Sequence, residues 1–165
     1  MKTKLVTGGL GFIGSHLVRS LLATGHRVVV IDDLSNHSLE SQEEFSASDN
    51  FELIVHDVSK PFPEIESAID KVFHLAALVS VPDSFQNPLR THQVNETGLI
   101  NVLEFCRLQR VKKLVYASSC AVYGSSENVP LEESELVVPE SPYGLTKLNN
   151  EYYARFHHQA YGTSS

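Results

Sequence analysis

The chain contains 165 residues, of which 42% are hydrophobic and 20% are charged, and its formal net charge is −7. This length suits one compact domain with a buried core. The acidic balance argues against nucleic acid as a partner, because a surface that follows phosphates needs clustered lysine and arginine. The longest uninterrupted apolar run, residues 75–79, is far too short to cross a membrane.

The N-terminus and the cysteines bear on the compartment and on metal binding. The first residues lead directly into an apolar strand, without the pattern of a signal peptide. Cys106 and Cys120 have neither a CxxC spacing nor a Cys/His spacing typical of metal sites. Because isolated cysteines are typical of a reducing compartment, we expect a soluble cytoplasmic protein without a metal ion.

The first part of the chain predicts a strand, a glycine turn, a helix and a second strand. Residues 5–7 form the short apolar strand, and apolar side chains recur at helical spacing over 13–22, before Gly25. The β-branched run 28–31 is typical of a buried parallel strand. Residues 35–50 are polar and acidic, which indicates a loop with at most a weak surface helix.

The remaining chain continues the alternation. Strands are expected over 51–55, 71–76 and 113–118, and a long helix with one buried stripe includes 99–106. The last helix is expected over 141–162, because a serine followed by proline is typical of an N-cap and first helical position. Such alternation predicts an α/β fold with a Rossmann-like, doubly wound parallel sheet between two helical layers.

The glycine turn predicts a dinucleotide site. Gly8 and Gly11 leave the backbone open to a pyrophosphate, Gly14 lets the helix approach the sheet, and the helix N-terminus offers free N–H groups. An ordinary structural turn is the alternative. Asp32 favours the dinucleotide, because it ends the next strand, where a carboxylate that binds ribose hydroxyls is expected.

The neighbourhood of Asp32 favours NAD over NADP. A carboxylate there repels a 2′-phosphate, and residues 33–36 contain no arginine or lysine to neutralise one. Asp57 after the third strand either contacts the adenine amino group or makes a local turn. After the fourth strand, the small side chains of Ala76 and Ala77 would let a cofactor pass closely.

Tyr143 and Lys147 form a candidate acid–base pair at positions i and i+4 of the last helix. A cation about 6 Å from a phenol favours the phenolate by roughly 3 kcal/mol at an effective dielectric of 20, so Tyr143 is a candidate proton acceptor. Two surface residues are the alternative. After the fifth strand, we interpret Ser118 as a turn cap, Cys120 as packing, and Ser119 as functional.

Seven segments in order along the chain together resemble the extended short-chain dehydrogenase/reductase family, in its NAD-dependent epimerase/dehydratase branch. They read TGGLGFIG, VIDDLS, HDV, HLAA, QVNETG, SSCAVYG and SPYGLTK. The resemblance implies that Tyr143 is the catalytic base, that Lys147 holds the nicotinamide ribose, that Ser119 completes the catalytic set and that Asn95 supports the site. The expected cofactor contacts are Gly8, Gly11, Phe12, Ile13, Gly14, Asp32, Asp33, Asp57, Val58, Leu75, Ala76, Ala77, Asn95, Tyr143 and Lys147.

The resemblance also narrows the expected reaction. Nucleotide-sugar 4,6-dehydratases carry Asp-Glu after the catalytic hydroxyl residue, and UDP-glucuronate decarboxylases usually keep the glutamate. Here Cys120 and Ala121 occupy these positions, and neither can do that acid–base work. Epimerisation of a UDP-sugar at C4 through a 4-keto sugar remains, with glucose and N-acetylglucosamine forms both open. Ser80 and Val81 are expected to touch the sugar, together with Ser119 and Tyr143.

Members of this family usually have about twice this length. Residues 1–165 are therefore expected to be an N-terminal NAD-binding domain that stops before the substrate domain. Three hypotheses stay open: the catalytic half of a UDP-sugar 4-epimerase, an NAD-binding module without turnover, and a scaffold for pairing. In the third, helices around 95–106 and 143–156 would form the four-helix homodimer interface of the family. Another NAD-dependent nucleotide-sugar oxidoreductase of the same branch is also possible.

Overall fold

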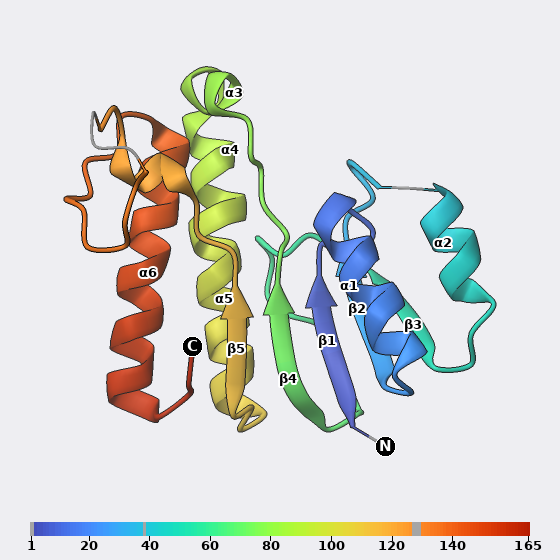
Figure 1. The fold of residues 1–165 in the computed structure, drawn as a ribbon. Helices are drawn as coiled ribbons and strands as arrows, with labels where there is room; N and C mark the ends of the chain where they lie inside the picture. Colours follow the sequence, from blue (N-terminus) through green and yellow to red (C-terminus); the bar gives the residue numbers. More distant parts are fainter. Residues whose placement is uncertain (1, 38, 127–129) are drawn as a thin grey trace.

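The computed structural model describes residues 2–37, 39–126 and 130–165. At its centre lies a five-stranded parallel sheet of order β3-β2-β1-β4-β5 (Figure 1). All strands point to the same edge of the sheet, the upper edge in Figure 1, so their carboxyl ends lie side by side. The strands are β1 (Thr3–Thr7), β2 (Arg27–Asp32), β3 (Phe51–Val55), β4 (Ile69–His74) and β5 (Lys113–Tyr116).

Helices cover both faces of this sheet, as the sequence predicts. They are α1 (Phe12–Ala23), α2 (Leu39–Ser46), α3 (Val81–Gln86), α4 (Pro88–His92), α5 (Gly98–Leu108) and α6 (Pro142–Tyr161). A π-helical segment, η1 (Gln93–Thr97), joins α4 to α5, and a 3-10 turn, η2 (Cys120–Tyr123), follows β5. Within the described ranges, none of the helices has the length and apolarity needed to cross a membrane.

Alternation along the strands divides the core into two clusters. Val6, Val28 and Val30 face α1 and α2, whereas Leu5 and Val29 face α5. Because successive side chains of a strand point to opposite faces, the β-branched run of β2 supplies both clusters at once. The three-layer α/β arrangement therefore follows directly from these continuous apolar strands.

One expectation about the helices needs correction, and another is confirmed. Residues 39–46, expected to be mostly loop, form helix α2, whose Phe45 is buried and packs its ring 5.6 Å from that of Phe51. The helix expected to include 99–106 is confirmed as α5, and the π-helical segment η1 directly precedes it. Apolar spacing alone predicts neither α2 nor η1. A single buried aromatic side chain anchors α2, and a π turn shifts the helical register by one residue.

The last helix begins and ends as its sequence predicts. The Ser141 hydroxyl oxygen accepts a hydrogen bond from the Gly144 N–H at 3.0 Å, and Gly162 ends the helix in the left-handed conformation. The chain then returns to the sheet, where the Leu114 N–H donates to the carbonyl oxygen of Ser164 at 2.8 Å. Ser164 thereby pairs in parallel with Lys113 at the outer edge of β5.

The turn between β1 and α1 is packed so closely at two glycines that no side chain fits there. A Cβ atom at Gly14 would lie 2.0 Å from the carbonyl oxygen of Gly8. Gly8 itself has φ +67° and lies against the backbone of Ala76, after β4, where a Cβ would come within 2.7 Å. A Cβ on Gly11, by contrast, would lie 3.4 Å from its nearest neighbour, the carbonyl oxygen of Gly8, which is an ordinary contact. The turn therefore packs tightly through Gly8 and Gly14, whereas Gly11 has room for a methyl group.

These contacts predict different outcomes for two alanine substitutions. Gly14→Ala should lower the free energy of unfolding by about 2–3 kcal/mol, because the backbone must shift to make room for the methyl group. Gly11→Ala, the matched control, should lower it by less than about 1 kcal/mol. Urea unfolding followed by circular dichroism measures both values. Equal destabilisation by the two variants would contradict the packing role of Gly14.

Candidate cofactor and catalytic site

A cleft of about 380 Å³ lies along the carboxyl ends of the strands. Its wall includes the glycine turn after β1, residues that follow β2, β3, β4 and β5, and two side chains of α6. Of the predicted cofactor contacts, the cleft brings together Gly8, Gly11, Phe12, Ile13, Gly14, Asp32, Asp33, Val58, Leu75, Ala76, Ala77, Tyr143 and Lys147. Most of the predicted set therefore shares one surface.

The carboxylate of Asp32 is fixed at the end of β2. One oxygen accepts a hydrogen bond from the Leu10 N–H of the glycine turn at 3.0 Å, and the other from the Leu34 N–H at 3.0 Å. The side chain is nearly buried, yet it lines the cleft. Each carboxylate oxygen accepts more than one hydrogen bond, so Asp32 retains the capacity to bind ribose hydroxyls.

Tyr143 and Lys147 lie on the first turns of α6, and both are buried. The ammonium nitrogen of Lys147 is 5.9 Å from the centre of the Tyr143 ring and donates a hydrogen bond to the carbonyl oxygen of Ala117 at 2.9 Å. Helix α6 approaches η2 closely, because a Cβ on Gly144 would come within 2.6 Å of the Ala121 carbonyl oxygen. The separation of phenol and cation agrees with the distance expected from their helical spacing.

Burial changes the protonation of two groups at this end of the cleft. It lowers the pKa of Lys147 to about 8. Burial, together with the positive charge of Lys147, lowers the pKa of His74 to about 3, so His74 is neutral at physiological pH. The His74 ring contacts the Thr7 hydroxyl, with Nδ1 and Oγ1 2.7 Å apart. Because His74 is neutral, it adds no second positive charge near Lys147.

The two serines after β5 make different contacts. Ser118, interpreted as a turn cap, lines the cleft, and its hydroxyl donates a hydrogen bond to the Glu151 carboxylate of α6. Ser119 is the cap of η2, because its oxygen accepts a hydrogen bond from the Ala121 N–H at 3.2 Å. Its hydroxyl hydrogen is not used in that contact, so Ser119 keeps a donor.

Asn95 supports the wall of the cleft rather than forming it. Its amide oxygen accepts from the Leu78 N–H at 2.8 Å, and its amide nitrogen donates to the Leu78 carbonyl oxygen at 3.0 Å and to the Thr146 hydroxyl at 3.1 Å. The segment after β4 is thereby tied to both η1 and α6. Ser80 and Val81 lie just beyond the wall, where the Ser80 hydroxyl caps α3 by accepting from the Asp83 N–H.

Asp57 also lies beside the cleft. Its carboxylate forms an ion pair with Arg90 of α4 at 3.0 Å and accepts a hydrogen bond from the Ser59 N–H at 2.9 Å. Burial opposes ionisation, but the hydrogen bonds from Ser59 and Arg90 outweigh it and lower the pKa of Asp57 below its usual value. The local turn considered for Asp57 is present. The partner on α4 lies too far away in the sequence to be inferred from local spacing.

Several residues of the wall were not predicted from the sequence. Most of them lie next to a predicted residue in the sequence, and they are Ile31, Ser35, Asn36, His56, Leu78, Val79, Val94, Ala117 and Ser118. Position at a strand end identifies part of this group, because parallel-sheet sites lie at carboxyl ends. Only the tertiary structure shows which side chains turn into the cleft.

Known proteins resemble this chain throughout its length. UDP-glucose 4-epimerase 2 of Oryza sativa is 40% identical over 160 residues, which cover 90% of this chain and 38% of the relative. The putative UDP-glucose 4-epimerase of Methanocaldococcus jannaschii is 36% identical over 96% of this chain and 52% of its own. The chain thus spans about half the length of the curated relatives it matches.

Solved structures share the fold as well. The UDP-N-acetylglucosamine 4-epimerase of Methanobrevibacter ruminantium, in complex with UDP-N-acetylmuramic acid, superimposes with a TM-score of 0.89 at 39% identity, over 98% of this chain and 52% of that one. The expectation of NAD agrees with other neighbours that are NAD complexes. Residues 5–165 match the family described as GDP-mannose 4,6 dehydratase. This chain therefore belongs to that NAD-dependent epimerase/dehydratase family, as its seven ordered segments predict.

Proposed function

We propose that residues 1–165 are the NAD-binding and catalytic half of a nucleotide-sugar 4-epimerase that acts on UDP-glucose or its N-acetyl form. The observation that carries the proposal is one continuous cleft with Asp32 near one end and Tyr143 with Lys147 at the other. The similarity to UDP-sugar 4-epimerases over nearly the whole chain supports it. We also propose a cytoplasmic location, in line with the two free thiols of Cys106 and Cys120.

The residues of the cleft fit a dinucleotide. The N-terminus of α1 offers N–H groups to a pyrophosphate, and Gly11, which lines the cleft without a side chain, leaves room for it. Asp32 would bind the adenosine ribose, and Lys147 the nicotinamide ribose. The small side chains of Ala76 and Ala77 line the wall between these ends. NAD supplies a hydride acceptor and donor, which epimerisation at C4 requires.

Tyr143 would hold the proton that moves during the reaction. When the C4 carbon is oxidised to a ketone, the Tyr143 phenolate oxygen would accept the proton of the C4 hydroxyl. The positive charge of Lys147 stabilises the phenolate, and the free donor of Ser119 would bind the sugar oxygen. After the sugar turns over and the ketone is reduced on its opposite face, Tyr143 would return the proton to the C4 oxygen.

A second candidate is an NAD-binding module without turnover. The observation that favours it is that Ser80 and Val81, which are expected to touch the sugar, lie outside the cleft wall. The described residues of the wall therefore offer few contacts for a UDP-sugar. Turnover of UDP-galactose by this chain would reject the module. Another oxidoreductase of the same branch would oxidise the sugar without epimerising it.

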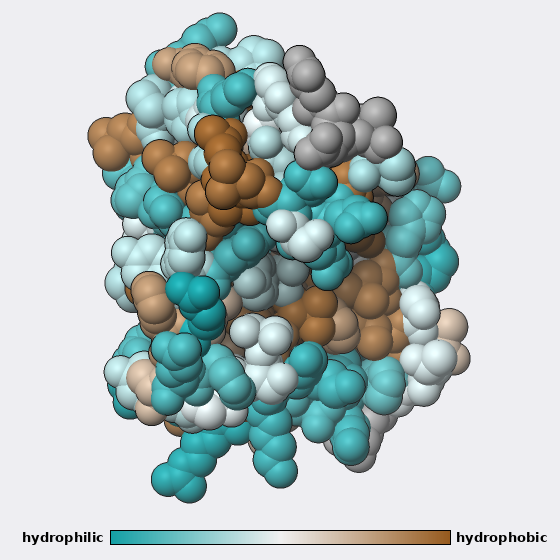
Figure 2. Space-filling view, turned by 60° about the vertical axis from the view of Figure 1, so that its left-hand side comes forward, coloured by the Kyte–Doolittle hydropathy of each residue, from teal (hydrophilic) through white to brown (hydrophobic). Residues whose placement is uncertain are grey.

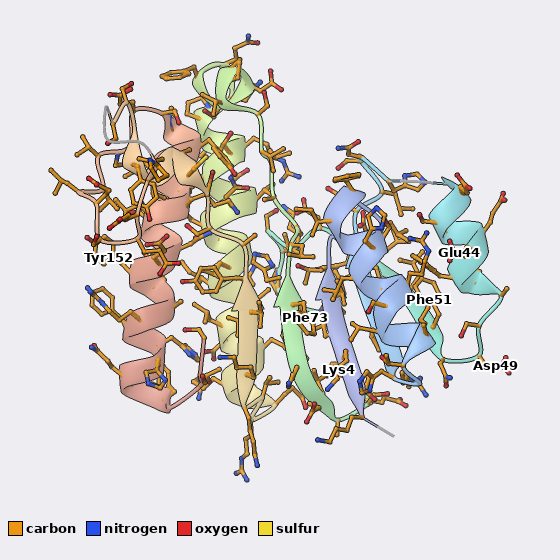
Figure 3. All side chains as sticks on the ribbon, viewed as in Figure 1. Lys4, Glu44, Asp49, Phe51, Phe73 and Tyr152 are labelled. Atoms are coloured by element: carbon orange, nitrogen blue, oxygen red, sulfur yellow. The ribbon has the colours of Figure 1, made fainter. Side chains whose placement is uncertain are left out.

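We further propose that the protein forms a homodimer through a four-helix bundle. Apolar and aromatic side chains reach the surface along α5 and α6, with exposed fractions of 38% for Ile100, 43% for Tyr153 and 54% for Phe156. Figure 3 shows Tyr152 on the side of α6 that points away from the sheet. On this side of the molecule, apolar patches interrupt the hydrophilic surface (Figure 2). Such patches are typical of protein interfaces.

Removing the Asp32 carboxylate should weaken NAD binding and reduce discrimination against NADP. By calorimetric titration, the unchanged chain should bind NAD saturably and NADP much more weakly. Asp32→Asn should raise the Kd for NAD by about 10–100-fold, because hydrogen bonds to a charged group are lost. Asp49→Asn is the matched control, because Asp49 is exposed between α2 and β3. Unchanged NAD affinity of Asp32→Asn would contradict the ribose role.

Replacing the Tyr143 hydroxyl should stop the chemistry without preventing cofactor binding. Tyr143→Phe should lower the rate of UDP-galactose conversion by at least about 100-fold, since proton transfer through a positioned group is lost. Its Kd for NAD should stay near that of the unchanged chain. Tyr123→Phe, a tyrosine of η2 outside the cleft wall, is the control. Normal turnover by Tyr143→Phe would show that another group moves the proton.

The buried Lys147 predicts a dependence of stability on alkaline pH. Its pKa of about 8 lies below the usual value of 10.5, so between these values the unfolded chain binds more protons than the folded chain. The free energy of unfolding should therefore rise by up to roughly 3 kcal/mol as the pH increases through this window. Lys147→Met should lack this rise. Parallel curves for both proteins, measured by urea unfolding, would contradict the prediction.

A further inference from the structure

Helix α6 binds the π-helical segment η1 through a buried amide that the proposed chemistry does not use. Asn150 of α6 is almost fully buried, and its Nδ2 atom donates a hydrogen bond to the backbone carbonyl oxygen of Asn95 at 3.1 Å. In space, α6 lies beside the column formed by α4, η1 and α5 (Figure 1). The bond joins residues that are 55 positions apart in the sequence, so no local helical rule requires it.

The other half of the same amide is unpaired. The Asn150 Oδ1 atom is buried and has no hydrogen-bond partner in the part of the chain that the structure describes. A buried acceptor without a donor costs free energy, so an apolar side chain of similar size would suit the packing between these helices at least as well. What the amide contributes at this position is therefore its directional bond to the backbone of η1.

The partner of Asn150 lies where the helical pairing changes. In η1 the Gly98 N–H donates to the carbonyl oxygen of Gln93, five residues earlier, whereas an α-helix pairs residues four apart. Single π turns are rare within α-helices, and they occur frequently at functional sites. A contact that holds the backbone of η1 therefore decides which way the side chains of this segment point.

The side chain of Asn95 transmits this constraint to the cleft. Its Oδ1 atom accepts from the Leu78 N–H and its Nδ2 atom donates to the Leu78 carbonyl oxygen, and Leu78 lines the cleft. The same Nδ2 atom donates to the Thr146 hydroxyl, which in turn donates to the Tyr143 carbonyl oxygen at 2.7 Å. A shift of the helical register by one residue would turn the Asn95 side chain by about 100° and break its three bonds.

The order of the strands places Leu78 in the half of the cleft that contains Lys147. Leu78 follows β4, which lies between β1 and β5 in the sheet. Lys147 binds the Ala117 carbonyl oxygen after β5, whereas Asp32 ends β2 on the other side of β1. The wall that Asn95 holds therefore belongs to the half proposed for the nicotinamide riboside and not to the half proposed for the adenosine.

We propose that Asn150 is a positioning residue, which fixes the register of η1 so that Asn95 holds the cleft wall at Leu78. Its effect on cofactor affinity rests on the proposed NAD-binding function. Its effect on the wall does not, because the bonds of Leu78 are formed within the chain.

Asn150→Leu and Asn150→Ala together test the proposal, because both lack the amide donor and only leucine fills the volume of asparagine. In both variants the Leu78 amide should exchange its hydrogen at least about ten-fold faster, as measured by NMR, since Asn95 no longer holds it. In Asn150→Leu the amides of β2 should exchange at unchanged rates. This difference separates a local loss of the wall from a general loss of stability.

Cofactor binding gives a second measurement. By calorimetric titration, the Kd for NAD should rise by about ten-fold in both variants. The Kd for ADP, which lacks the nicotinamide riboside, should not change. Asn149→Leu is the matched control, because this neighbouring amide of α6 donates to the Glu96 carboxylate of η1 and not to its backbone. It should change neither the Leu78 exchange rate nor the Kd for NAD.

The outcomes separate the role of Asn150 from the proposed function. If Asn150→Leu behaves as the unchanged chain and only Asn150→Ala differs, Asn150 acts by packing and the proposal is overturned. An unchanged Leu78 exchange rate in Asn150→Ala overturns it as well, even if Asn150→Leu does not fold. If the unchanged chain does not bind NAD, the proposed function fails, whereas the exchange of Leu78 still decides the role of Asn150.

Discussion

The close packing of the turn between β1 and α1 is the constraint on which the cleft depends. Gly8 touches the backbone after β4, and Gly14 touches Gly8, so neither position has room for a side chain. The Leu10 N–H of the same turn donates to Asp32 at the end of β2. This short turn thereby holds the ends of the adjacent strands β2, β1 and β4 together. It also places the N-terminus of α1 in the wall of the cleft.

At the other end of the cleft, burial of a cation shapes the chemistry. Lys147 is surrounded by protein and is held by a carbonyl oxygen rather than by a carboxylate. Its charge is therefore not neutralised and acts on the Tyr143 ring nearby. The neutral His74 beneath it binds Thr7, which ties this end of the cleft to β1. Such an arrangement costs stability, which is typical of sites where function sets the electrostatics.

Between these ends, the walls are held by side chains that do not face the cleft. Asn95 binds both backbone groups of Leu78 and joins them to α6, whereas the ion pair of Arg90 with Asp57 joins α4 to the loop after β3. Polar side chains outside the cleft thus hold the backbone of its wall in place. A rigid wall is what a cofactor needs if its reactive carbon is to meet the substrate in one geometry.

The sequence by itself determined the five strands, helices α1, α5 and α6, the parallel sheet, the glycine turn and the placement of Asp32, Tyr143 and Lys147. These features follow from local rules: β-branched runs, helical spacing of four residues and the position of a residue at a strand end. Local rules left open whether Asp57 binds a ligand or makes a turn. They also favoured a turn cap at Ser118, whereas the structure places Ser119 at the cap of η2. They gave no sign of η1 or of the bond that Asn150 makes to it. Only the tertiary structure decided these points, because a side chain's partner, such as Arg90 for Asp57, comes from an element that lies far away in the sequence.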